Sequence, residues 1–234
     1  MKNIRHILGK ELKSYFIAPI AYIVIAIFLL VTGWFFFSTF FLYNQASLRN
    51  FFSLLPIIFS FIIPAVTMRL FSEELHVGSY EVLMTLPLTF WEVIVGKFLA
   101  AVMFVMIMLL PTLSYAVTIA VLGRLDLGPI VGGYIGAIFL GALFSAIGLL
   151  ASALTRNQII AFIIGMSICF ALTLIDKMLF FLPESLLGVL EYIGADFHFQ
   201  NIAKGILDSR DILYFASASF MALYAGNLVM QGKK

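Results

Sequence analysis

The sequence predicts an all-α integral membrane protein with six transmembrane helices, and two observations predict it. Hydrophobic residues make up 63% of the 234 residues and charged residues only 11%, whereas a soluble domain has about 25% charged residues. The apolar residues also gather in six stretches, each near the roughly 20 residues that a helix needs to cross a bilayer. A soluble enzyme, a nucleic-acid-binding domain and a disordered chain are therefore excluded.

The segment before the first apolar stretch predicts a basic amphipathic helix that lies in the membrane interface. In residues 2–16, apolar side chains recur at helical spacing, and the basic side chains, among them Arg5, Lys10 and Lys13, occupy the other side. Two interpretations stay open for this interfacial helix. It is either an anchor that sets the topology or a docking surface for a partner protein.

The six spans are expected to form a single transmembrane domain over residues 1–234. Their predicted ranges are 16–42, 51–68, 98–122, 130–154, 158–182 and 212–230. The first follows a basic segment, as in a signal peptide, but it is too long for one, so we expect a retained anchor. Pro56, Pro64 and Pro111 fall inside spans, where kinks for packing are the simplest interpretation and a hinge is the alternative.

The distribution of Lys and Arg predicts that both termini lie in the cytoplasm. With that orientation, nine of the 14 basic residues lie on the inner side, as the positive-inside rule favours. The net charge of +2 is too small to imply a polyanionic partner, so we expect no nucleic acid.

The spans offer almost no side chains for chemistry. Their one ionisable pair is Asp176-Lys177, which we place near the outer interface, where Lys177 can reach the headgroups. Cys169 is the only cysteine, so an internal disulfide is excluded, and the sequence has no zinc motif, no P-loop and no Gly-x-Ser-x-Gly elbow. We therefore expect no catalytic residue, metal or cofactor in this chain, and any transport must be driven from outside it.

The polar segment between spans two and three predicts a folded cytoplasmic structure rather than a slack loop. Ser72 is expected to cap a short helix, and Gly78 to end it in the left-handed conformation. Ser79 is expected to cap a second helix that stops at Pro87. Residues 89–92, Thr-x-x-Glu, form a capping box that starts the helix of span three.

Acidic residues in this segment contribute nothing to topology. We therefore expect Glu73, Glu74 and Glu81 to bind a partner, and solvated helix caps are the alternative. Because the segment lies outside the spans, we expect changes at Glu73, Glu74 and Gly78 to leave folding intact.

Three segments of the sequence resemble the ABC-2 type transporter permeases. Residues 73–81 read Glu-Glu-x-x-x-Gly-Ser-x-Glu and are followed by Leu-Pro and then Gly96-Lys97. This order is similar to the coupling segment of that family, with Ser79 in place of the usual Thr. Residues 148–158 and 198–215 are similar to the gliding-motility type branch of these permeases.

The resemblance implies the permease subunit of an ATP-binding cassette exporter in the cell (inner) membrane. A coupling helix would dock on a separate ATPase, present in two copies, which holds the ATP and Mg. The implied further partners are the lipid bilayer, a second permease copy and an additional outer-facing membrane subunit. The coupling residues would be Glu73, Glu74, Gly78, Ser79 and Glu81.

The polar segment between spans five and six, residues 183–211, is apolar in its first half but too short to span. It is expected to lie in the interface or to re-enter the membrane, and a plain extracellular loop is the alternative. The family resemblance implies two short outer-facing helices here that cap the exit of the pathway. The residues that we assign to this outer-facing segment are His198, Lys204, Asp208 and Arg210.

Two other functions are the alternatives to transport. An intramembrane lipid-modifying enzyme would need a polar catalytic set inside the spans, and a membrane assembly anchor would not stimulate an ATPase. The charge-free spans favour an amphipathic or lipid-like cargo, or mechanical work on an external protein. Span four carries glycines expected at a helix contact, either between two permease copies or within one: Gly132, Gly133, Gly136, Gly141 and Gly148.

Overall fold

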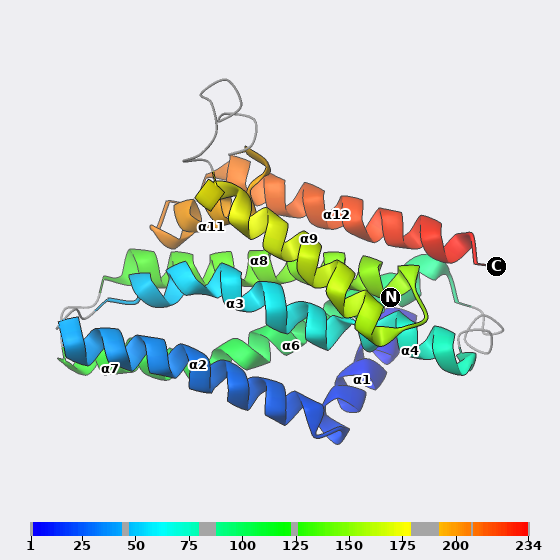
Figure 1. Ribbon diagram of the computed structural model, residues 1–234, viewed down its shortest axis with the longest axis horizontal. Helices are drawn as coiled ribbons and strands as arrows, with labels where there is room; N and C mark the ends of the chain where they lie inside the picture. The colour runs from blue at the N-terminus through cyan, green and yellow to red at the C-terminus, as the bar shows by residue number, and fades with distance from the viewer. Residues whose placement is uncertain are drawn as a thin grey trace.

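The computed structural model describes residues 2–43, 47–79, 88–122, 126–178, 192–206 and 208–233. Within these ranges all regular structure is helical (Figure 1). The elements are α1 (Lys2–Ile17), α2 (Ile20–Tyr43), α3 (Arg49–Thr67), α4 (Arg69–Val77), α6 (Phe90–Leu109), the 3₁₀ turn η1 (Leu110–Thr112), α7 (Leu113–Leu122), α8 (Leu127–Leu154), α9 (Gln158–Met178), α11 (Ala195–Ala203) and α12 (Ser209–Gln231). Among the described residues, six helical segments are long and apolar enough to cross a membrane, which confirms the predicted fold class.

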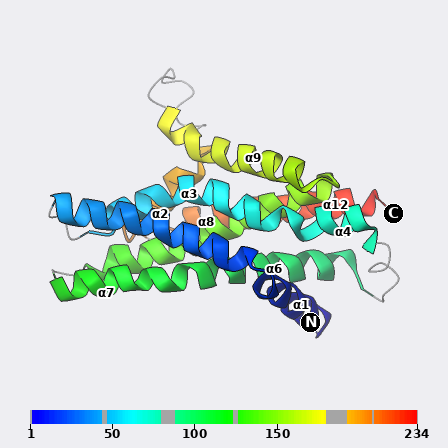
Figure 2. The same cartoon turned by 60° about the horizontal axis from the view of Figure 1, so that its bottom comes forward.

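The helix α8 forms the centre of the bundle. It packs against α3, α6, α9, α11 and α12, and buried side chains follow it along most of its length. The outer helices α2, α9 and α12 expose many large apolar side chains, as expected of a surface that faces lipid. Both chain ends lie at the same end of the bundle, together with α4 and the turn between α8 and α9 (Figures 1 and 2).

The glycines of α8 allow close contacts within this chain. A methyl group on Gly133 would overlap the ring of Phe52 in α3, and one on Gly148 would overlap Thr67 at the end of the same helix. A methyl group on Gly141 would overlap a side chain of α6, and one on Gly132 would overlap the backbone at the end of α11. One on Gly136 would be in tight contact with side chains of α11 at 3.2 Å. These glycines are buried by intramolecular neighbours, so the alternative of a contact between two permease copies is wrong for them.

The first span begins at Ile20 and not at the predicted position 16. Phe16 belongs to α1, which ends at Ile17, because Pro19 disfavours helical conformation at the preceding residue. The third span begins at Phe90 rather than at 98, since the Thr89 capping box starts the helix as expected. The predicted end of the fifth span, at 182, lies outside the described residues.

The prolines occupy two kinds of position. Pro56 and Pro64 lie inside α3, whereas Pro111 lies in η1, where the third span changes from α to 3₁₀ and back. The hydroxyl of Thr112 donates to the carbonyl oxygen of Leu109 at 2.7 Å, so it satisfies a backbone group next to the interruption.

Candidate functional site

A break in the second span marks the start of the candidate site. α3 and α4 follow one another with a turn at Met68, and Ser152 of α8 fills the gap between them. Its Oγ donates to the Met68 carbonyl at 2.7 Å and accepts from the backbone N–H groups of Phe71 and Ser72 at 2.9 and 3.0 Å. Ser152 therefore caps α4 from another helix.

The prediction that Ser72 caps this helix is wrong. α4 begins at Arg69, four residues earlier than expected, so Ser72 lies inside the helix and is buried. Its hydroxyl donates back to the carbonyl of Met68, the usual bond of a serine in a helix interior.

The end of α4 agrees with the prediction. Gly78 follows Val77 with a φ of 79°, the left-handed conformation that favours glycine. Ser79 comes next and is exposed. Glu81 and the second helix that we expected after Ser79 lie outside the described residues.

The N-terminal segment forms the expected amphipathic helix. In α1, Ile7 and Tyr15 are buried, and the basic residues Arg5, Lys10 and Lys13 are exposed. Ile7 packs so closely on Gly96 of α6 that a Cβ there would lie 2.7 Å from its Cγ2. One face of α1 is therefore already covered by the bundle. The location of α1 in the membrane interface stays a prediction.

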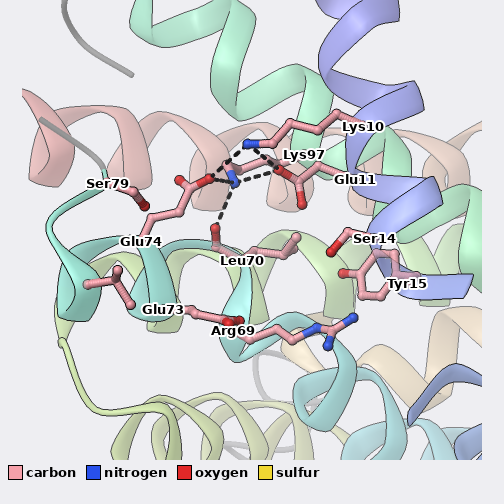
Figure 3. A pocket seen from close by; sticks show the side chains of 11 residues that line it. Lys10, Glu11, Ser14, Tyr15, Arg69, Leu70, Glu73, Glu74, Ser79 and Lys97 are labelled. Atoms are coloured by element: carbon pink, nitrogen blue, oxygen red, sulfur yellow. Dashed lines mark hydrogen bonds and ion pairs between the residues drawn. The ribbon is translucent and has the colours of Figure 1, made fainter. Parts of the chain in front are cut away.

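A buried lysine, Lys97, joins α1, α4 and α6 (Figure 3). Lys97 of α6 is 1% exposed. Its Nζ donates to Glu11 Oε1 of α1 at 2.9 Å, to Glu74 Oε1 of α4 at 2.8 Å and to the Leu70 carbonyl at 2.8 Å. All three ammonium hydrogens have an acceptor, which a buried charge requires. Lys10 adds a longer ion pair to Glu74 at 3.6 Å.

The Lys97 cluster, which is Lys10, Glu11, Glu74 and Lys97, borders a cavity of about 260 Å³. Arg69 and Glu73 lie on the opposite wall (Figure 3). The Arg69 guanidinium lies 4.9 Å from the ring centroid of Tyr15, and burial raises the pKa of this tyrosine. The lining has three acids and three cations, so the cavity is formally neutral.

Glu73 and Glu74 differ although they are neighbours in sequence. Glu73 is exposed, as expected of a docking residue. Glu74 turns inward to Lys97, and its Oε2 is buried without a hydrogen-bond partner in the described part of the chain. The premise that Glu74 makes no contact with the spans is wrong, because its side chain binds Lys97 of a membrane-spanning helix; we therefore expect a change at Glu74 to lower stability.

Glu11, Tyr15 and Arg69 were not predicted as site residues, and Lys97 was predicted only as part of the Gly96-Lys97 motif. One feature of the sequence could have identified Glu11. Ile7, Glu11 and Tyr15 are four residues apart, so they share one helix face. An acid between two apolar residues on the buried face of a helix predicts a cationic partner in the protein.

A second polar cluster lies toward the other end of the bundle and joins α9, α11 and α12. Asp176 Oδ2 accepts from the Phe197 N–H at 2.6 Å, and Lys177 pairs with Asp196 Oδ2 at 3.0 Å. The pair that we expected at the interface thus holds the first turn of α11.

In this second cluster, which we call the His198 cluster, a buried histidine joins α11 to α12. Nδ1 of His198 lies 2.6 Å from Asp211 Oδ1. The ring of Tyr214 stacks on His198 with centroids 4.0 Å apart, and its hydroxyl donates to the Ile193 carbonyl at 2.6 Å. Together with Asp176, Lys177 and Asp196, these groups hold α11 between two spans.

The residues assigned to the outer-facing segment divide into two groups. His198 is buried, whereas Lys204, Asp208 and Arg210 are exposed. Asp208 caps α12 by accepting from the Arg210 N–H at 3.1 Å. α11 is a helix packed on α8, so the alternative of a plain loop is wrong there. The position of the other implied helix, before residue 192, lies outside the described residues.

Comparison with models of protein families identifies a match. A sequence profile described as "ABC-2 family transporter protein" matches residues 37–207, which is more than two thirds of the chain. No curated protein matches it. The matched range contains α4, Lys97 and α11, and it leaves α1 outside.

Proposed function

Since the chain belongs to the ABC-2 family of transporter proteins and is a multi-pass membrane permease, we propose that it couples ATP hydrolysis by a separate ATPase to movement across the membrane. Permeases of this family are transmembrane components without an ATPase site of their own, and they normally work with an ABC ATPase. In this proposal the partner, in two copies, holds all the ATP and Mg, and this chain binds no cofactor.

The observation that carries the proposal is the charged cavity beside the end of α4. Its rim presents Glu73 and Ser79, two residues that the family resemblance assigns to ATPase coupling. Exposed acids on such a rim can pair with basic residues of a partner, which gives orientation and specificity. Gly78 directs the chain away from α4 at this point.

The connections of α4 support a route for the movement. α4 continues the second span through one turn at Met68, so a displacement at Gly78 passes into α3 without crossing a long loop. Lys97 ties α4 to the third span and Ser152 ties it to the fourth. A push on the cavity rim therefore acts on three spans together, as a rigid-body shift requires.

The rest of the assembly follows from the same family. We propose that both termini and the cavity face the cytoplasm, in the cell (inner) membrane, and that two permease copies enclose the pathway of an exporter. The resemblance of residues 198–215 supports the gliding-motility type branch and, with it, an additional outer-facing subunit.

A pair of charge reversals tests the coupling site. Glu73→Lys changes an exposed acid that lines the cavity, and Lys13→Glu changes an exposed base of α1 that does not. Each tagged permease is purified from its native membrane with the ATPase bound, and the hydrolysis rate is measured in proteoliposomes. We expect Glu73→Lys to lose at least about tenfold in bound ATPase or in stimulated rate, and Lys13→Glu to retain both.

Thermal unfolding of each permease alone is the control for folding. Equal bound ATPase and equal stimulation by Glu73→Lys and the unmodified chain would show that the cavity rim is not the coupling site.

A further inference from the structure

A second cavity lies where the start of α3 meets the end of α11. Its volume is about 270 Å³, somewhat below the range of sites for drug-sized ligands. Both helix ends belong to the half of the bundle remote from the two chain termini (Figure 1). The residues that line it are Arg49, Asn50, Phe52, Ser53, Gln200, Ala203 and Lys204.

The charges around this cavity have one sign. Arg49 and Lys204 both line it, and no acid does. Both side chains are exposed, and neither has an ion pair with an acid within the described ranges. Arg49 also borders a smaller cavity that Asp126 lines, yet no ion pair joins these two residues. Two cations from separate elements therefore face one cavity, and no acid among the residues described pairs with either of them.

The remaining wall determines what kind of anion fits. Asn50 has an amide group that can donate, whereas Gln200 already donates its amide N–H to Asp196 Oδ1 at 3.0 Å. Phe52 and Ala203 give the cavity an apolar side. A guanidinium and an ammonium match a phosphate or carboxylate, and the apolar wall matches the carbon atoms attached to it.

We infer that this cavity binds the anionic head group, of phosphate type, of an amphiphile. Arg49 supplies a planar pair of donors and Lys204 a point charge from the facing helix. The same chemistry is offered by a phospholipid and by free phosphate, so the experiment must separate the two sources.

The test measures the thermal unfolding midpoint of the whole purified chain. The probes are phosphatidylglycerol, phosphatidylcholine and inorganic phosphate, each titrated into the detergent-solubilised protein. A ligand that binds only the folded state raises the midpoint with its concentration. We expect phosphatidylglycerol to bind at least about tenfold more tightly than phosphatidylcholine.

The variants are Arg49→Gln and Lys204→Gln, singly and together, with Arg210→Gln as the matched control. Arg210 is an exposed cation near the same α11–α12 turn, and it does not line the cavity. We expect the double variant to lose the preference for phosphatidylglycerol and Arg210→Gln to keep it. Since the side chains of Arg49 and Lys204 are exposed, the unfolding midpoints of the variants and of the unmodified chain should agree when no ligand is added. If the double variant does not fold, either single variant replaces it in the test.

Each result of these titrations either supports or overturns the binding of an anionic head group. Stabilisation by phosphatidylglycerol that depends on Arg49 and Lys204 supports a lipid head group, and stabilisation by inorganic phosphate alone with the same dependence supports a free anion. No stabilisation by either anion, or equal stabilisation of the unmodified chain and the double variant, overturns the inference.

Discussion

The Lys97 cluster and the His198 cluster each tie three helices together, but the first borders a cavity and the second is centred on the buried pair His198–Asp211. Lys97 joins α1, α4 and α6 beside a cavity of about 260 Å³, with Lys10 and Glu73 exposed next to it. His198 of α11 points to α12, with its ring stacked on Tyr214 and with the carbonyl of Tyr192 near its Nε2.

The difference shows what each cluster is able to do. The Lys97 cluster combines a fully paired lysine with exposed charged neighbours, so it joins three helices and, in our proposal, borders the docking rim. The His198 cluster uses its polar groups to hold α11 in place, and aromatic rings cover it. We therefore expect changes in the first cluster to affect stability and coupling, and changes in the second to affect stability alone.

The largest effect is expected from Lys97→Met. The substitution removes the buried cation and leaves the carboxylates of Glu11 and Glu74 close together, with only the longer pairs to the exposed Lys10 to compensate them. Breaking a buried pair in this way costs about 3–5 kcal/mol. The free energy of unfolding in detergent, measured by denaturant titration, should fall by this amount.

A compensating variant sharpens this prediction. In Lys97→Met/Glu11→Gln/Glu74→Gln no buried charge is left unpaired, and Lys10, which loses its acidic partners, is exposed to solvent, so most of the lost free energy should return. A single Lys97→Met variant as stable as the unmodified chain would contradict the assignment of Lys97 as the joint.

The next effect in size is expected from His198→Leu. Asp211 then loses its partner at 2.6 Å while its carboxylate stays buried, which costs about 1–3 kcal/mol. Unfolding should be measured together with ATPase stimulation in proteoliposomes. Stability should fall and stimulation per folded molecule should not, and a loss of stimulation would remove the contrast between the two clusters.

A smaller effect is expected from Gly78→Val, compared with Gly78→Asn. An added Cβ meets no atom within 4 Å at this position, so the whole cost comes from the φ of 79°. That cost is about 1–2 kcal/mol for valine, while asparagine tolerates the conformation better. Coupling, measured as the ratio of transport to hydrolysis, should fall in Gly78→Val and be largely kept in Gly78→Asn. Equal coupling in both variants would contradict a role for this backbone conformation.

The smallest effect is expected from Lys177→Gln, which compares the same residue type in the two clusters. The side chain of Lys177 is 45% exposed, against 1% for Lys97. Water screens its ion pair with Asp196, so the loss should stay below about 1 kcal/mol. A loss as large as that of Lys97→Met, in the same denaturant titration, would show that exposure does not separate the two clusters.

The sequence predicts those features that depend on neighbouring residues. The spans follow from apolar runs, the left-handed Gly78 from its place after a helix, and the Thr89–Glu92 capping box from a spacing of three. The start of the first span was wrong by four residues because Pro19 acts on the chain before it.

The features that the sequence could not predict depend on distant partners. The cap of α4 comes from Ser152, 80 residues after Ser72, and Lys97 pairs with Glu11 over 86 residues. No periodicity connects such positions. The helical spacing of Ile7, Glu11 and Tyr15 indicated that Glu11 needs a cation, but it did not indicate which one.

The cap that Ser152 places on α4 has a consequence for the order in which the chain matures during synthesis. At the usual rate of about 5–20 residues per second, the 80 residues between Ser72 and Ser152 take roughly 4–16 s to make. During that interval the first N–H groups of α4 lack their acceptor, although Lys97 has already emerged to meet Glu74. The α4 end of the second span is therefore completed only after the fourth span has been made, so a chain that stops between the two would leave the start of α4 without its cap.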